Sequence, residues 1–175
     1  MWNRCIVPAD MKDATLAQVL NEALLDEYKA RDTYRKIIET FGAVRPCINI
    51  VEAEQRHIES LLTLYEKYHF PLPAIPGPDR IDVPDSPLKT CQLGMEAEIA
   101  KLTLYDRLIE ATDPPDVIEV LKRLQSASRD NHLPAFQRCV ERGGATGPGA
   151  SHGRRHGRSF DSGQDFGRRP GRPRR

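Results

Sequence analysis

The chain has 175 residues, with 26 Lys or Arg and 25 Asp or Glu, so its formal net charge is +1. The charge is unevenly distributed, because residues 143–175 carry eight Arg and two Asp, which leaves residues 1–142 with 18 bases and 23 acids. The length is enough for one domain with a real hydrophobic core. No apolar run approaches membrane-spanning length, and the polar N-terminus is too short for a signal peptide, so we expect a soluble cytoplasmic protein without membrane contact.

The four cysteines lie far apart in the sequence. None belongs to a Cys-x-x-Cys pair, which argues against a zinc knuckle, a rubredoxin-type iron site or a dense disulfide framework. We therefore expect isolated, reduced thiols. The cysteines concerned are Cys5, Cys47, Cys91 and Cys139.

Apolar residues at the helical period predict four helices. The first is expected over residues 15–42, because Thr15 and the residues up to Gln18 form a capping-box pattern. The second is expected over residues 46–68, with Pro46 in its first turn.

Start signals also mark the third and fourth helices. Ser86-Pro87 opens the third, and the Asp-Pro-Pro-Asp run at 113–116 caps the fourth, which extends to Arg142. The connection over residues 69–85 contains five prolines and cannot be helical, and its length suits a crossover along a bundle.

These elements divide the chain into three parts. Residues 1–14 are an N-terminal extension, and residues 15–142 form an all-α four-helix bundle with a long Pro-rich crossover between its second and third helices. Residues 143–175 are rich in Gly, Arg, Pro, Ser and His and lose the helical period, which predicts a disordered basic tail.

Charged and ionisable residues interrupt the apolar stripe of every predicted helix. Burying such a group without a partner is costly, so each needs another charge, a hydrogen-bond network or a metal. In the second helix two of them are three residues apart and share one face. The residues are Glu27, Glu54, His57, Glu98 and His132.

The chain also repeats itself. A shift of 71 residues superposes the first and third helices, and a shift of 75 superposes the second and fourth. Two helix pairs that each offer Glu on the first helix and His on the second predict a pseudo-two-fold bundle, the arrangement that builds carboxylate-bridged di-iron or di-manganese sites. The matched pairs are Glu27 with Glu98, Tyr34 with Tyr105, and His57 with His132.

At these residues the sequence resembles the ferritin-like superfamily on its rubrerythrin side, and more closely an uncharacterised bacterial family of ferritin-like domains. The motifs that carry the resemblance are Ala53-Glu54-Gln55-Arg56-His57 and Asn131-His132-Leu133 followed by Ala135-Phe136, within residues 15–140. The resemblance implies a non-haem metalloprotein that binds one or two ions of iron or manganese in oxidant or peroxide handling, as a rubrerythrin-like peroxidase or oxidase. It implies these metal ligands: Glu27, Glu54, His57, Glu98 and His132.

Other features of that family are absent or altered here. No rubredoxin-like cysteine domain is present, so electrons for a redox reaction must come from a separate donor. In ferritin-like oxidases, tyrosines near the metals carry electrons or donate to carboxylates. We interpret Tyr34 and Tyr105 instead as core aromatics whose hydroxyls reach a polar edge.

The pattern departs from the family at the sixth ligand. The symmetric partner of Glu54 is Arg129, and Arg cannot bind a metal. Asp130 is rotated by about 100° and points off the site, and Pro134 is expected to kink the helix. Three outcomes remain open: two ions held loosely, one ion, or a metal-free salt-bridge cluster organised by Arg129.

The basic tail supports an alternative function. Residues 143–175 combine Gly-Arg repeats with Phe160 and Phe166, a composition typical of segments that bind nucleic acid electrostatically. A solubilising extension would have the same composition. The alternative is therefore a metal-free helical-bundle interaction module with a nucleic-acid-associating tail. A homo-oligomer is compatible with either function, although nothing in the sequence specifies a storage shell.

Overall fold

A computed structural model describes residues 9–77 and 81–145, with side chains from residue 15 onwards. Within these ranges all regular elements are helical, so the predicted all-α class is confirmed. None of the described helices has the length and apolarity needed to cross a membrane. In chain order the elements are α1 (Ala9–Phe41), α2 (Cys47–Tyr68), α3 (Pro87–Glu110), α4 (Pro115–Ala127), the π-helical turn η2 (Ser128–His132) and α5 (Leu133–Glu141).

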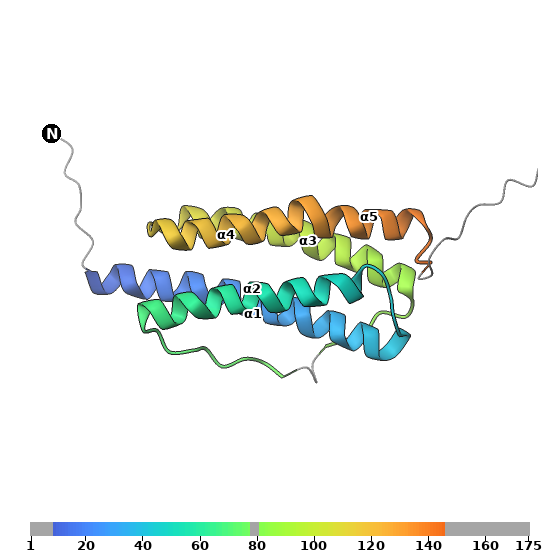
Figure 1. Cartoon of the computed structure of the whole chain (residues 1–175), viewed down its shortest axis with the longest axis horizontal. Coiled ribbons are helices and arrows are strands. Elements are labelled where there is room, and N and C mark those ends of the chain that lie inside the picture. Colours follow the sequence, from blue (N-terminus) through green and yellow to red (C-terminus); the bar gives the residue numbers. More distant parts are fainter. Residues whose placement is uncertain (1–8, 78–80, 146–175) are drawn as a thin grey trace, which may run out of the picture.

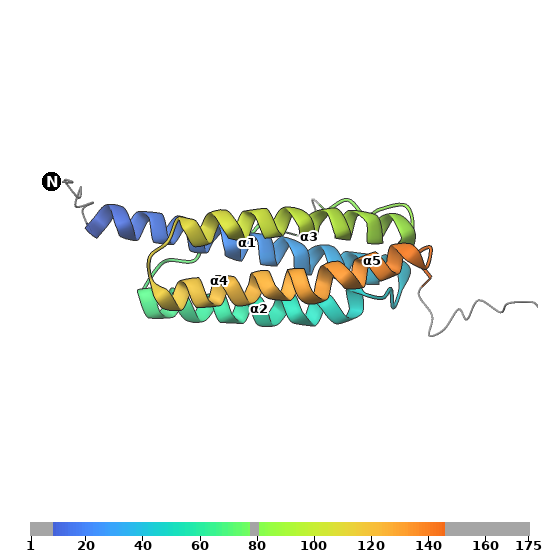
Figure 2. The same cartoon turned by 90° about the horizontal axis from the view of Figure 1, so that it is seen from above.

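The helices lie side by side along one long axis (Figures 1 and 2). α1 packs mainly against α2, and α3 packs against both α4 and α5. α2 ends at the opposite end of the molecule from the start of α3, so the connection between them spans its length (Figure 1). The described parts of this connection, residues 69–77 and 81–86, are not helical, as their prolines predict.

The helix starts agree with the sequence signals except at α1. Ser86 caps α3 by accepting a hydrogen bond from the backbone N–H of Lys89 at 3.2 Å. α1 begins at Ala9, six residues before the capping-box pattern at Thr15. The residues between them contain no Gly or Pro and include good helix formers, so the helix extends past the predicted start.

η2 interrupts the fourth predicted helix just before Pro134. The backbone N–H of Leu133 donates to the carbonyl of Ser128, five residues earlier, which is the π-helical pattern. Pro134 has no N–H, so the ordinary helical ladder cannot continue through it, as expected. The extra residue in this turn buries Ser128 and leaves Arg129 exposed.

Two apolar clusters fill the interior on either side of a polar segment. One contains Leu20, Leu24 and Leu61, and the other contains Ile37 and Phe136. Along each helix, the buried charged residues fall between the members of these two clusters. The apolar layers therefore flank a charged centre midway along the molecule.

The expectation of reduced, isolated cysteines is wrong for two of the four. Cys91 and Cys139 form a disulfide that joins α3 to α5, with a Cα–Cα distance of 5.9 Å. The two helices approach closely because Gly94 has no Cβ, which would overlap the ring of Phe136. Cys47 is a free, buried thiol, and Cys5 lies outside the described residues.

The disulfide should contribute strongly to stability, because it closes a loop with a sequence separation of 48. The chain-entropy relation gives a loss of about 4 kcal/mol in the free energy of unfolding when both Cys91 and Cys139 are replaced by Ser. Urea unfolding measures this loss. Reductant should lower the midpoint of the wild-type protein and leave that of the double variant unchanged; an equal effect on both would contradict the prediction.

Candidate metal centre

The five residues predicted as metal ligands come together in the polar segment between the two apolar clusters. Glu27 comes from α1, Glu54 and His57 from α2, Glu98 from α3 and His132 from η2. The three glutamates are fully buried, and His132 is 4% exposed. They form two groups that share Glu54, namely Glu27 with Glu54 and His57, and Glu54 with Glu98 and His132.

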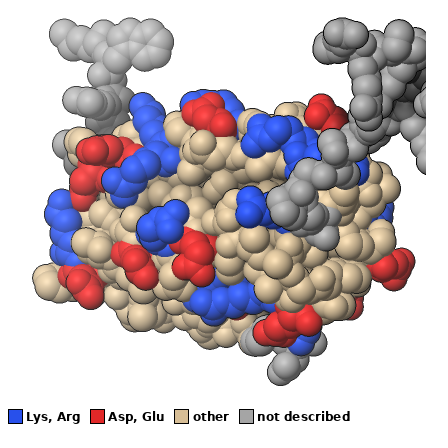
Figure 3. Space-filling view, turned by 45° about the vertical axis from the view of Figure 1, so that its right-hand side comes forward, with Lys and Arg blue, Asp and Glu red and all other residues tan. Residues whose placement is uncertain are grey.

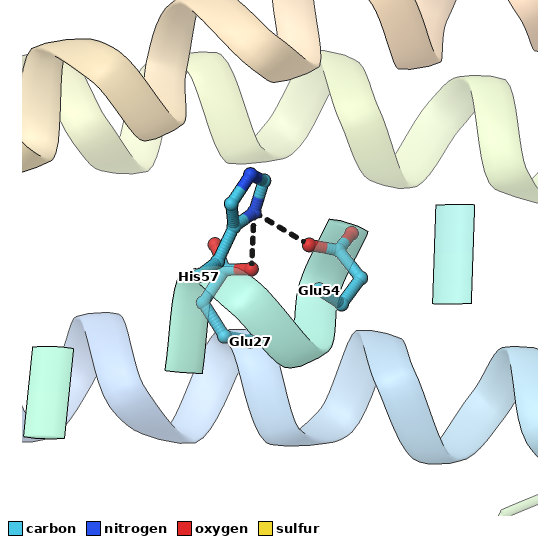
Figure 4. A group of neighbouring side chains, drawn as sticks. All are labelled: Glu27, Glu54 and His57. Atoms are coloured by element: carbon cyan, nitrogen blue, oxygen red, sulfur yellow. Dashed lines mark hydrogen bonds and ion pairs between the residues drawn. The ribbon is translucent and has the colours of Figure 1, made fainter. Parts of the chain in front are cut away.

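The first group is tied together by a histidine nitrogen (Figure 4). Nδ1 of His57 lies 3.1 Å from Oε2 of Glu27 and 2.9 Å from Oε2 of Glu54. These are hydrogen-bond distances, so one proton on Nδ1 can satisfy both carboxylates. The first group is therefore a closed network without a metal.

The second group is more open. Nδ1 of His132 lies 3.6 Å from Oε1 of Glu54 and 3.6 Å from Oε1 of Glu98. Both distances exceed a hydrogen bond, and this buried nitrogen has no hydrogen-bond partner among the described residues. Two ligands that are each about 2.1 Å from one divalent ion are separated by roughly 3.0–3.6 Å. The donor set and the spacing of the second group therefore fit a divalent ion.

The two tyrosines follow the repeat seen in the sequence. The hydroxyl of Tyr34 on α1 donates to Oε1 of Glu98 on α3 at 3.0 Å. In the reciprocal sense, the hydroxyl of Tyr105 on α3 donates to Oε1 of Glu27 on α1. Both rings are buried, and the hydroxyls reach the carboxylates themselves. The pseudo-two-fold pairing predicted from the 71-residue shift thus extends to hydrogen bonds.

A lysine that the sequence analysis assigned no role sits among these carboxylates. Nζ of Lys101 lies 3.3 Å from Oε1 of Glu27, 3.3 Å from Oε1 of Glu54 and 3.4 Å from Oδ2 of Asp26. The residue is 5% exposed. The sequence signal for this residue was its position, three residues after Glu98 on a buried helix face. The signal was insufficient because the acidic partners of Lys101 come from other helices. Position 30, its counterpart in the 71-residue repeat, is Ala, so Lys101 breaks the symmetry.

One of the three outcomes left open was a metal-free cluster organised by Arg129, and the position of Arg129 contradicts that role. Its guanidinium is 54% exposed and pairs with Asp130 at 3.0 Å, away from the buried carboxylates. The cause is the π-helical turn, which places Ser128 rather than Arg129 on the buried side. The cation that faces Glu27 and Glu54 is Lys101.

The charges of the first group follow from this packing. Burial by itself raises the pKa of Glu27, but Lys101 and the hydrogen bonds from Glu54 and His57 together hold it well below its usual range. Burial and the neighbouring charge of Glu27 raise the pKa of Glu54 to about 8, despite Lys101. Burial lowers the pKa of His57, but its hydrogen bonds to Glu27 and Glu54 outweigh that effect and raise it to about 9. At neutral pH the first group therefore carries protons on Glu54 and His57.

Those two pKa shifts predict how the stability of the metal-free protein depends on pH. Glu54 and His57 bind their protons more tightly in the folded state, so their stabilising contributions are complete below pH 4.5 and pH 6.5, and disappear as pH rises through about 8 and about 9. Stability should therefore fall by about 4–5 kcal/mol between pH 6.5 and 9. Urea unfolding in the presence of a chelator measures this, and a flat or rising profile would contradict it.

A cavity reaches the histidine side of the centre. It has a volume of about 420 Å³ and lies between α2 and the η2 region. Both His57 and His132 line it, together with polar residues such as Asn49, Asp130 and Asn131. The two imidazole rings stack with their centroids 5.7 Å apart. This polar opening is a route by which an ion can reach both groups.

Comparisons with known proteins bear on the fold. No family model matches the chain, and no match was found among curated proteins. A solved structure of a hypothetical protein from Methanococcus jannaschii is similar, with a TM-score of 0.66 and 24% sequence identity, over 83% of this chain and 88% of that one. This similarity supports the helical fold and carries no information about activity.

Proposed function

We propose that the protein is a ferritin-like four-helix bundle and a non-haem metalloprotein that binds iron or manganese in its core. The observation that carries this proposal is the unpartnered Nδ1 of His132, which faces one oxygen each of Glu54 and Glu98 in a water-poor interior. Imidazole combined with carboxylates suits iron and manganese. A buried nitrogen without a partner is costly, and a bound ion would remove that cost.

The two groups have different roles in this proposal. Glu54, Glu98 and His132 hold one ion, while Lys101 and protonated His57 neutralise Glu27. Lys101 also lies 3.3 Å from Oε1 of Glu54, the oxygen that faces His132. The bound ion would supply one-electron redox chemistry for oxidant or peroxide handling, with electrons from a separate donor. Tyr34, by donating to Oε1 of Glu98, fixes the orientation of that ligand.

Elemental analysis of protein purified without a histidine tag tests the proposal. After anaerobic loading with ferrous iron or manganese and removal of free metal, we expect about one ion per chain. Consumption of hydrogen peroxide by the loaded protein, compared with the metal-free protein, tests the reaction. Absence of bound metal after loading would overturn the metalloprotein proposal.

The ion pairs of Lys101 with Glu27 and Glu54 favour a second candidate function, a metal-free helical bundle that serves as an interaction module. Glu27 and Glu54 already face an internal cation, so this part of the centre does not require a metal. The basic tail proposed to associate with nucleic acid comprises residues 143–175. Its residues beyond 145 lie outside the described residues. On the face shown in Figure 3, basic and acidic side chains are interspersed, so that face offers no broad basic surface for nucleic acid.

A further inference from the structure

A second cavity approaches the charged centre from a different side. It has a volume of about 580 Å³, lies between α1 and α3, and is covered by residues 81–84 of the crossover connection. Cavities of this size hold small molecules. The histidine-side cavity is lined by α2 and the η2 region instead, so this second cavity is a separate approach to the same carboxylates.

The walls of the cavity are mainly apolar, and its polar groups belong to the centre already described. Tyr34, Glu98 and Lys101 line it at the level of the buried carboxylates. Lys29 and Asp82, both exposed, stand at its rim with opposite charges. The apolar lining residues are Ala30, Ile37, Ile81, Leu93, Ala97 and Leu104.

Polar atoms without hydrogen-bond partners come from residues that line this cavity. They are Oε2 of fully buried Glu98, Oγ1 of Thr90, which is 2% exposed, and Oδ2 of Asp26. Oε2 of Glu98 is not the atom that faces His132 or Tyr34, because both of those face Oε1. Thr90 lies eight residues before Glu98 on α3, or about 12 Å along the helix.

These atoms define the charge that a ligand should carry. Carboxylate oxygens are acceptors. Oδ2 of Asp26 already faces the ammonium of Lys101 at 3.4 Å, whereas Oε2 of Glu98 has no donor among the described residues. The ammonium of Lys101 does not balance the surplus, because it is shared among the carboxylates of Asp26, Glu27 and Glu54.

We propose that this cavity binds an elongated small molecule with an apolar body and a protonated amino group. The amino group donates to Oε2 of Glu98, and the apolar body extends along α3 between the apolar walls towards Thr90. This proposal deepens the proposed function by naming its substrate class. A reaction of the bound amine would rest on the proposed metal, whereas binding of the amine needs no metal.

Calorimetric titration of the metal-free full chain at pH 7 tests this with three probes of equal chain length: n-octylamine, n-octanol and octanoate. We expect one saturable site for octylamine, with at least tenfold weaker binding of octanoate. Glu98→Gln should weaken octylamine at least tenfold and leave octanol unchanged, whereas Glu96→Gln, an exposed change on the same helix, should have no effect. Ala97→Trp, at an exposed position that lines the cavity, should abolish binding of all probes.

Two results would overturn the proposal. One is octanoate binding as tightly as octylamine, and the other is octylamine binding that survives Ala97→Trp. The second test does not depend on Glu98, so it stands even if Glu98→Gln fails to fold. Metal content is measured separately: amine binding without metal uptake would leave the cavity proposal and remove the metalloprotein, and metal uptake without amine binding would do the reverse.

Discussion

Replacing Glu54 by Gln should abolish metal binding while leaving the metal-free protein folded. Glu54 belongs to both ligand groups, so its loss removes a carboxylate from each of them. Changes to residues that only support metal ligands cost about 10–100-fold in affinity, and loss of this shared ligand should cost more than about 100-fold. Elemental analysis after anaerobic loading measures the result.

The fold should tolerate this change because of the protonation state of Glu54. Its pKa is raised to about 8, so at neutral pH the side chain is already a neutral acid of nearly the same shape as Gln. We expect the free energy of unfolding of the metal-free protein to change by less than about 1 kcal/mol. Glu27→Gln should destabilise the protein more, because Glu27 is ionised and faces Lys101.

The matched control is Glu52→Gln, an exposed substitution on the same helix. It should retain wild-type metal content and stability. If Glu54→Gln keeps its metal, the ion does not lie at either group. If it loses metal only by unfolding, the raised pKa of Glu54 is not a property of the folded protein.

Helical periodicity was sufficient to predict that the three buried glutamates would meet. Glu27, Glu54 and Glu98 lie on apolar stripes of different helices, and packing those stripes together brings the three carboxylates to one place. The internal repeat added a finer prediction, since it paired Tyr34 with Tyr105 and each hydroxyl now donates to the glutamate of the other repeat. These features follow from spacing along single helices.

The features that the sequence did not reveal depend on contacts between helices or on a local change of helix type. The π-helical turn shifts the helix by one residue, so an alignment that assumes a regular helix places Arg129 in the core, where the structure has Ser128. The disulfide joins cysteines 48 residues apart, with no motif to link them. Lys101 could be placed on a buried face, but its role depends on acidic groups from two other helices.

Lys101→Met should strongly destabilise the metal-free protein. Removing one partner of a buried ion pair leaves the other charge uncompensated, which typically costs about 3–5 kcal/mol. Here the ammonium faces the ionised and fully buried Glu27, and Met keeps much of the apolar length of the side chain. Urea unfolding of the metal-free protein measures the loss. Lys89→Met, an exposed change on the same helix, is the matched control.

The same substitution should also change the metal stoichiometry. Without the ammonium, Glu27 and Glu54 regain a need for positive charge, and together with His57 they offer a second set of ligands. Iron or manganese loading should therefore rise from about one to about two ions per chain and recover part of the lost stability, because an ion that binds only the folded state stabilises it. If the variant is destabilised but still binds one ion, the first group is not a latent metal site. If the variant is as stable as the wild type, Lys101 does not compensate the buried charge of Glu27. The proposal that a metal ion occupies the second group while the ammonium serves the first group would then be wrong.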